Sequence, residues 1–179
     1  MPIQVKTKAV RLSYLHVFEP QAAHGGDPKY SVALIIPKSD KALVKMLRDA
    51  EEAAIQEGMA AGGKFNGKRP KKSDSPLRDG DEKGDEAYAD SYYISAKSHA
   101  KKKPKLFDIN NEPLEDPEDL YSGCYGRAII NFYPYNVNGS AGIAVGLEGI
   151  KKIRDGERLG GASITAAAFG DDDEDEFEG

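Results

Sequence analysis

The stretch that most constrains the fold spans residues 121–136 and reads YSGCYGRAIINFYPYN. Its aromatic and β-branched residues predict a β-strand, in which successive side chains point to opposite faces of a sheet. One predicted face is apolar and suits a core; it carries Cys124, Ala128, Ile130 and Phe132. The other mixes flat rings with a guanidinium and an amide; it carries Tyr125, Arg127, Ile129, Asn131, Tyr133 and Tyr135. We therefore expect a sheet that buries one side of this strand and exposes the other.

The exposed face allows two interpretations. Flat rings beside a guanidinium suit the stacking of unpaired bases and contact with phosphate. Alternatively, the tyrosines are ordinary strand residues, half buried with their hydroxyl groups at the rim, because aromatic residues are common in strands. The strand alone does not decide between these two interpretations, so the rest of the chain has to be weighed.

Apolar runs bounded by Gly, Pro and Asn predict the other strands, at residues 5–18, 30–36, 88–97, 106–109 and 143–153. The run at 30–36 is nearly continuous in apolar residues and is expected to be central. The first strand should place four residues on one face: Val10, Leu12, Tyr14 and Phe18. Asn138-Gly139, between two strand-like runs, signals a tight hairpin. Gly146 and Gly149 in the returning strand indicate a bulge or sharp coiling.

One segment has helical spacing. Ser39 is expected to cap a helix that runs to about residue 57. Its recurring apolar positions are Leu43, Val44, Leu47, Ala50, Ala54 and Ile55. Several strands with a single amphipathic helix predict a mainly β fold, an oligonucleotide-binding (OB) fold-like antiparallel barrel. We expect residues 1–158 to form this domain and residues 159–179 to form a flexible, disordered acidic tail.

Charge is unevenly distributed along the chain. The last nine residues, DDDEDEFEG, hold seven acids. Removing these from the 30 acidic residues leaves 23 against 25 Lys and Arg, a net charge of +2 for the body. The tail could compete with phosphate for a basic groove and, once displaced, engage partner proteins, or it could serve only as a solubilising segment. Its predicted partner-binding residues are Asp171, Asp172, Asp173, Glu174, Asp175, Glu176 and Phe177.

Two basic loops, at residues 64–72 and 97–105, flank the aromatic strands. Such loops commonly lie against phosphate, although a solvated basic loop is the plainer alternative. Tyr93 shares a predicted strand face with Lys97, next to the second loop. The candidate backbone contacts are Lys68, Arg69, Lys71, Lys72, Lys97, Lys101, Lys102 and Lys103.

Catalytic and metal-binding motifs are weak or incomplete. The run GGKFNGK at residues 62–68 nearly fits a phosphate-binding loop, but Arg69 stands where a hydroxyl is required and a helix rather than a strand precedes it. The three histidines are scattered, and Cys124 has no nearby partner residue in the sequence. We expect no cofactor, no metal and no enzymatic activity. The remaining enzymatic alternative is a metal-dependent nuclease using Asp79, Asp81 and Glu82.

The cellular location follows from what the sequence lacks. No apolar run approaches the length of a membrane span, and the N-terminus has no signal-peptide pattern. A lone cysteine cannot form an internal disulfide, which suits a reducing compartment. We therefore expect a cytoplasmic protein of a bacterial host cell.

Six stretches resemble the phage and prophage single-stranded DNA-binding proteins: LSYLHVFEP, KYSVALIIPKSD, PLRDGDE, YSGCYGRAIINFYPYN, GIAVGL and IRDGERLGG. That family pairs an OB fold with an acidic C-terminal tail. The resemblance implies a role in phage DNA replication, recombination or repair, frequent dimerisation, tail-mediated contact with replication proteins and no catalytic residues. This chain departs from the family where Glu178 and Gly179 follow Phe177, since such tails commonly end on an aromatic or apolar residue.

These observations predict a non-enzymatic single-stranded DNA-binding protein that coats and protects its ligand. The alternative is a phage structural or interaction protein whose aromatic face packs on another subunit. The predicted DNA-binding residues are Tyr125, Arg127, Asn131, Tyr133, Tyr135, Tyr93, Lys97, Lys101, Lys102, Lys103, Lys68, Arg69, Lys71 and Lys72.

Overall fold

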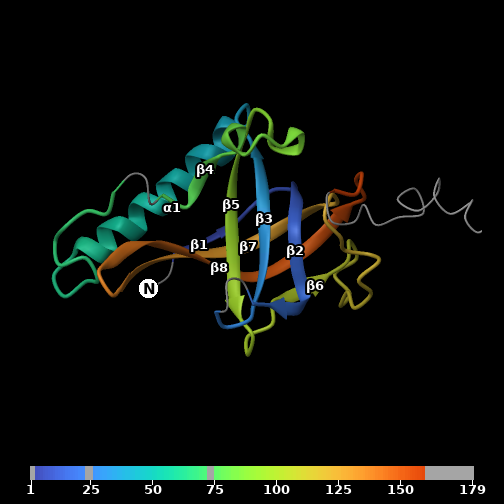
Figure 1. The fold of residues 1–179 in the computed structure, drawn as a ribbon. Coiled ribbons are helices and arrows are strands. Elements are labelled where there is room, and N and C mark those ends of the chain that lie inside the picture. Colours follow the sequence, from blue (N-terminus) through green and yellow to red (C-terminus); the bar gives the residue numbers. More distant parts are fainter. Residues whose placement is uncertain (1–2, 23–25, 72–74, 160–179) are drawn as a thin grey trace, which may run out of the picture.

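The computed structural model describes residues 3–22, 26–71 and 75–159 (Figure 1). The strands are β1 (Ile3–Lys6), β2 (Val10–Gln21), β3 (Lys29–Pro37), β4 (Leu77–Asp79), β5 (Ser91–His99), β6 (Lys105–Phe107), β7 (Tyr125–Val137) and β8 (Ser140–Arg154). The helices are α1 (Lys41–Met59) and two short 3₁₀ helices, η2 (Gly80–Lys83) and η3 (Glu86–Tyr88). No helix in these ranges is long and apolar enough to cross a membrane.

Five strands close into a barrel. They pair in the order β7–β2–β3–β5–β8, and β8 pairs with β7 to complete the ring. All of these pairings are antiparallel except that of β5 with β8, which is parallel and has one register pair, Lys97 with Gly146. Strands β1 and β6 extend the sheet beside β7 and β8, and β4 pairs with β5. The prediction of a mainly β, OB-fold-like barrel with one helix is confirmed.

The core lies inside the barrel and follows the alternation of β7. Cys124, Ala128 and Ile130 are fully buried, and Phe132 is 1% exposed. Apolar side chains from β2, β3, β5 and β8 complete the cluster. The predicted inner face of the strand is therefore confirmed residue by residue.

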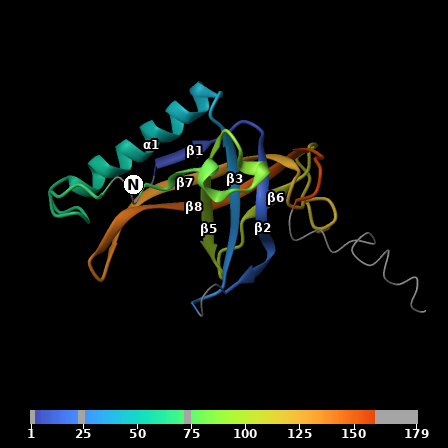
Figure 2. The same ribbon diagram turned by 45° about the horizontal axis from the view of Figure 1, so that its top comes forward.

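Helix α1 packs against β1 and β7, as the turned view shows (Figure 2). Its cap is Asp40 rather than the predicted Ser39, because the Asp40 carboxylate accepts a hydrogen bond from the Leu43 backbone N–H at 3.1 Å. The helix also runs two residues further than predicted, to Met59. Gly58 allows close packing here, since a Cβ at this position would lie 2.9 Å from Pro134 of β7.

Strands β7 and β8 continue past the barrel as a two-stranded ribbon (Figure 1). Asn138 and Gly139 have φ angles of 52° and 82° and join the strands in the predicted two-residue hairpin. The predicted bulge is also present: Ile129 pairs with Gly149 but Ile130 pairs with Leu147, so Glu148 is the extra residue.

The first predicted strand is wrong in two respects. It is broken at Thr7, whose hydroxyl accepts a hydrogen bond from the Ala128 N–H at 3.0 Å and so separates β1 from β2. Within β2, Tyr14 has a φ of 46° and the register with β3 shifts after Ser13. Tyr14 is consequently 55% exposed, whereas Ser13 is buried. The predicted single face of Val10, Leu12, Tyr14 and Phe18 does not exist.

The third predicted strand begins three residues late, at Ser91, because Tyr88 belongs to η3 and is fully buried. Residues 160–179 of the predicted tail lie outside the described residues, which end at residue 159.

Candidate nucleic-acid interface

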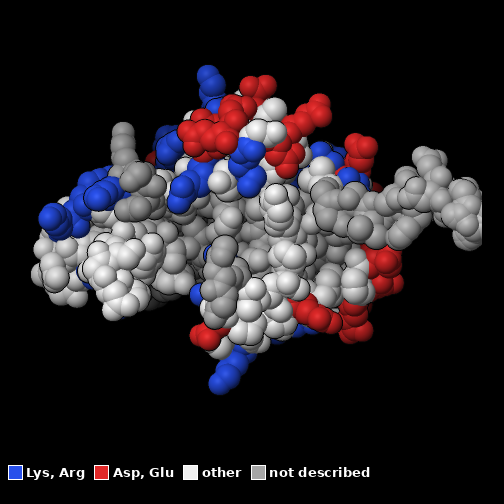
Figure 3. All heavy atoms as spheres, in the orientation of Figure 1, with Lys and Arg blue, Asp and Glu red and all other residues white. Residues whose placement is uncertain are grey.

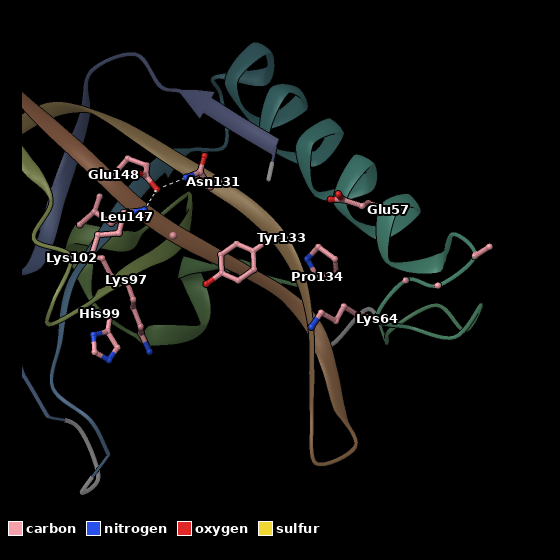
Figure 4. Close-up of a pocket in the computed structure, with 15 residues that line it drawn as sticks. Glu57, Lys64, Lys97, His99, Lys102, Asn131, Tyr133, Pro134, Leu147 and Glu148 are labelled. Carbon is pink, nitrogen blue, oxygen red and sulfur yellow. Dashed lines mark hydrogen bonds and ion pairs between the residues drawn. The ribbon is translucent and has the colours of Figure 1, made fainter. Parts of the chain in front are cut away.

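Two adjoining cavities, of about 790 and 700 Å³, lie between β5 and the β7–β8 ribbon. They share four lining residues: Lys97, Ser98, His99 and Tyr133. We call the combined depression the ribbon groove. Figure 4 shows Tyr133 on one wall, with Lys97 and His99 on the other.

Two tyrosines of the ribbon are backed by glycines of the neighbouring strand. Tyr133 is 41% exposed, and a Cβ on Gly146 would lie 3.5 Å from its ring. Tyr135 is half-buried over Gly142, where a Cβ would lie 2.9 Å from the Tyr135 hydroxyl. Because glycine has no side chain, each ring rests against the β8 backbone and its other side borders the groove.

The outer face of β5 supplies the opposite wall. Ser95 and Lys97 are exposed and Tyr93 is half-buried, while Ile94 and Ala96 point into the core with no exposure. This alternation was predicted and is confirmed. Tyr93 is held edge-on against Tyr88, with ring centroids 5.3 Å apart. Tyr93, Lys97, Tyr133 and Tyr135 all line the second cavity, so the structure brings these four predicted residues together.

The groove is mainly basic. Its cationic lining residues are Lys29, Lys64, Arg78, Lys97 and Lys102, against the acids Glu57 and Glu148. In Figure 3, Lys and Arg side chains gather over the loop after α1 and near the centre of this face, while acids gather along the upper edge. Lys29, Lys64 and Arg78 were not among the predicted contacts. Lys64 lies in the loop after α1 and Arg78 lies in β4, whereas Lys29 of β3 lies beside His99 of β5 in the strand register.

Asn131 and Lys102, both predicted to bind DNA, bind the bulged Glu148 (Figure 4). The Asn131 amide donates to the Glu148 carboxylate, and the Lys102 ammonium lies 3.2 Å from the same oxygen. These contacts neutralise the acid at the rim of the groove and hold the bulge in place.

Tyr125 and Arg127 lie away from the groove. Tyr125 is eight residues from Tyr133, which is roughly 26 Å along a strand. Its ring is covered by the guanidinium of Arg154 at 3.8 Å from the centroid. Arg127 donates a hydrogen bond to the Thr7 carbonyl at 2.9 Å and borders a separate cavity of about 460 Å³. The structure therefore places Tyr125 and Arg127 outside the groove that Tyr133 and Tyr135 line, and the role of Tyr125 and Arg127 in DNA binding stays a prediction.

The other basic candidates are scattered. Arg69 forms an ion pair with Glu52 of α1. This hydrogen-bonded contact lowers the pKa of Glu52 to about 2. Lys68, Lys71, Lys101 and Lys103 are exposed but do not line the groove. Lys72 and the predicted tail residues 171–177 lie outside the described residues.

In the nuclease alternative, Asp79, Asp81 and Glu82 would bind the metal, but two of these acids contact Lys38. The Lys38 ammonium lies 2.9 Å from Asp79 and 2.8 Å from Asp81. Hydrogen bonds from Lys38 hold the pKa of both carboxyl groups below the usual range. The ammonium thus lies between two of the three proposed metal ligands. Across the described ranges, no group of three or more His, Cys, Asp or Glu residues could hold a metal ion.

Known phage proteins are similar to this chain in sequence and in structure. Protein p50 of Acyrthosiphon pisum secondary endosymbiont phage 1 is 33% identical over 181 residues, covering 95% of this chain and 94% of that protein. The single-stranded DNA-binding protein from bacteriophage Enc34, solved in complex with ssDNA, matches with a TM-score of 0.78 and 26% identity over 88% of this chain and 90% of its own. Bacteriophage T7 gp2.5, a single-stranded DNA-binding protein, matches at 18% identity with a TM-score of 0.58, over 96% of this chain and 95% of its own, and supports the fold alone.

A family model, described as the ssDNA-binding protein of Enterobacter phage Enc34, matches residues 3–178. Because that match spans nearly the whole chain, the protein belongs to the family of the phage Enc34 ssDNA-binding protein.

Proposed function

We propose that the protein binds single-stranded DNA in the ribbon groove without catalysing a reaction. The observation that carries this proposal is the pairing of glycine-backed Tyr133 with Lys97 across a basic groove. In OB folds, the face of the second and third barrel strands, with the loop joining the last two, binds oligonucleotides. Here those strands are β3 and β5, and the loop is the β7–β8 hairpin. The ssDNA complex of the Enc34 relative supports the same ligand class.

Two kinds of contact would contribute to affinity. Stacking of a base on Tyr133, Tyr135 or Tyr93 is worth roughly 1–3 kcal/mol per base and does not depend on the base sequence. Lysine and arginine side chains attract the phosphate backbone in a salt-dependent way. Because duplex DNA hides the faces of its bases, this combination selects single strands.

The biological role follows from this binding mode. The protein would coat and protect single-stranded DNA during phage DNA replication, recombination or repair in the host cytoplasm. The acids of the tail, including residues 171–176, would compete for the basic groove when DNA is absent. Once displaced, the tail and Phe177 would contact replication or recombination proteins. A homodimer would place two grooves on one strand.

The test is a fluorescence anisotropy titration with labelled oligothymidine, beside a duplex of equal length, over a salt series. We expect tight binding of the single strand that weakens with salt, and little binding of the duplex. Lys97→Gln should lower affinity and reduce the salt dependence by about 0.7 in the logarithmic slope, the share of one phosphate contact. Lys45→Gln, which removes the same charge from an exposed position of α1 that does not line the groove, is the matched control.

Two outcomes would contradict the proposal. If neither the single strand nor the duplex binds, the exposed aromatic face is better explained as a contact surface for another subunit, as in a phage structural protein. If Lys97→Gln and the control variant bind equally well, the groove is not the site.

A further inference from the structure

A second aromatic cluster adjoins the ribbon groove at Tyr93. It contains Tyr14 of β2, Lys83 of η2 and Tyr88 of η3. Tyr88 is the link, since its ring centroid lies 5.3 Å from that of Tyr93 and 6.4 Å from that of Tyr14. Tyr93 itself lines the groove. The rings therefore connect the groove to Tyr14, but the middle ring, Tyr88, is fully buried, so only Tyr93 and Tyr14 can meet a ligand.

Tyr14 combines a strained backbone with an exposed ring. Its φ of 46° places it in the left-handed region, which a bulky aromatic residue rarely adopts. The ring gains little from burial in return, because the residue is 55% exposed. Backbone strain of this kind persists where the surrounding structure fixes it, and it is concentrated at binding sites. The register shift after Ser13 is what turns Tyr14 outward.

The ammonium of Lys83 lies close to all three rings. The Lys83 ammonium lies 5.1 Å from the Tyr14 centroid, 4.9 Å from that of Tyr88 and 5.0 Å from that of Tyr93. Cation–π attraction holds the ammonium there when nothing else covers the rings. A lysine stem is flexible, so a base arriving on Tyr14 can displace the ammonium toward the phosphate that accompanies that base.

We propose that Tyr14 and Lys83 form an additional nucleotide site, at which Tyr14 stacks a base and Lys83 contacts the adjoining phosphate. This proposal rests on the proposed function, because it extends the path of the same strand from Tyr93 across the barrel. Acids near Lys83 limit the path: Asp79 and Asp81 are bound to Lys38, while Glu82 of η2 and Glu86 of η3 are exposed. Asp85 lines a cavity of about 570 Å³ that Tyr14 also lines. The strand would therefore end its protein contact at Tyr14 and not pass over the acidic upper edge (Figure 3).

The absence of tryptophan from the chain allows a site-specific test. Two full-length variants, Tyr14→Trp and Tyr133→Trp, each carry a single tryptophan whose fluorescence is quenched by a stacked base. Each is titrated with an oligothymidine of about 16 nucleotides, the upper end of site sizes for one OB fold. We expect quenching in both variants. Phe107→Trp, at an exposed position of β6, is the control and should show none.

The outcomes separate the two proposals. Quenching of Tyr133→Trp without quenching of Tyr14→Trp would overturn the additional site and leave the groove intact. Quenching of neither would overturn the proposed function and this extension with it. Quenching that includes the Phe107 control would show that contact is not confined to this path, and would also overturn the inference.

Loss-of-ring variants give an independent readout. Tyr14→Gly removes the ring while suiting the left-handed backbone, so the fold should be retained, and the dissociation constant should rise between about 5-fold and 150-fold. Tyr14→Phe should bind as the wild type does, because the ring is kept. Lys83→Gln should reduce the logarithmic salt slope by about 0.7. Equal affinity and equal slope in wild type, Tyr14→Gly and Lys83→Gln would refute the site.

Discussion

The neighbouring aromatic residues Phe132 and Tyr133 offer a direct test of the two-faced strand. They are adjacent in β7, and each is replaced by alanine in a separate variant. Phe132 is 1% exposed inside the barrel, so its loss should destabilise the fold by about 3–5 kcal/mol. Tyr133 is 41% exposed and rests on a glycine, so its loss should cost only about 0.2–1 kcal/mol, the range of a cross-strand contact.

The two substitutions should affect DNA affinity in the opposite order. Removing the Tyr133 ring deletes one stacking contact, which is worth roughly 1–3 kcal/mol and corresponds to about a 5-fold to 150-fold rise in the dissociation constant. The Phe132 variant, measured under conditions where it remains folded, should bind within about threefold of the wild type. Stability is measured by urea unfolding followed by circular dichroism, and affinity by anisotropy with labelled oligothymidine.

Either of two results would contradict a two-faced β7 strand. If Tyr133→Ala destabilises the fold as much as Phe132→Ala does, the ring is a core residue and the predicted exposed face is a misinterpretation. If Tyr133→Ala is stable but binds with unchanged affinity, the ring faces a groove that DNA does not use. An unchanged slope of free energy against urea in both variants would confirm that two-state unfolding is being compared.

Three further predictions concern the tail, an ion pair and the hairpin. Truncation after Gly170 removes seven acids, so the anisotropy titration should give tighter ssDNA binding, most clearly at low salt; unchanged affinity at every salt concentration would remove the competitor role. Arg69 lowers the pKa of Glu52 from 4.5 to about 2, so its stabilising effect is complete above pH 4.5 and is lost as the pH falls toward 2. Urea unfolding from pH 5 to 2 should therefore show a steeper loss in wild type than in Glu52→Gln, and parallel curves would contradict the pairing. Gly139→Ala should lower stability by about 1–2 kcal/mol in the same assay through backbone strain alone, because φ is 82° and an added Cβ would meet no atom within 4 Å; a neutral effect would show that the turn relaxes.

The sequence predicted those features that depend on local periodicity. The inner and outer faces of β5 and β7 follow from alternation, and the hairpin follows from Asn138-Gly139, since few other dipeptides tolerate two left-handed residues in succession. The same rule failed in β2, because the positive φ of Tyr14 shifts the alternation and no sequence signal marks that shift. The exposed ring of Tyr14 was therefore predicted to share a face with Val10, Leu12 and Phe18.

Local sequence patterns could not predict contacts between residues that lie far apart in the sequence. Arg69 is seventeen residues from Glu52 along the chain, and the two meet only because the loop folds back on α1. Tyr125 belongs to the predicted face of β7, but the roughly 26 Å that separates it from Tyr133 and the covering Arg154 depend on strand length and tertiary packing. Residues on the same face of a strand therefore need not belong to the same binding site.

The position of the groove follows from how the barrel closes. Strands β5 and β8 share a single register pair, Lys97 with Gly146; Lys97 lines both cavities of the groove and Gly146 lines the first. A longer parallel pairing would bring the two strands together along their length and fill this space. At the contact itself, Gly146 leaves room for the Tyr133 ring, and the exposed Lys97 places a positive charge at the same level. The short closure therefore creates the depression and also sets an aromatic ring beside a cation, which is the pair of contacts that an unpaired nucleotide requires.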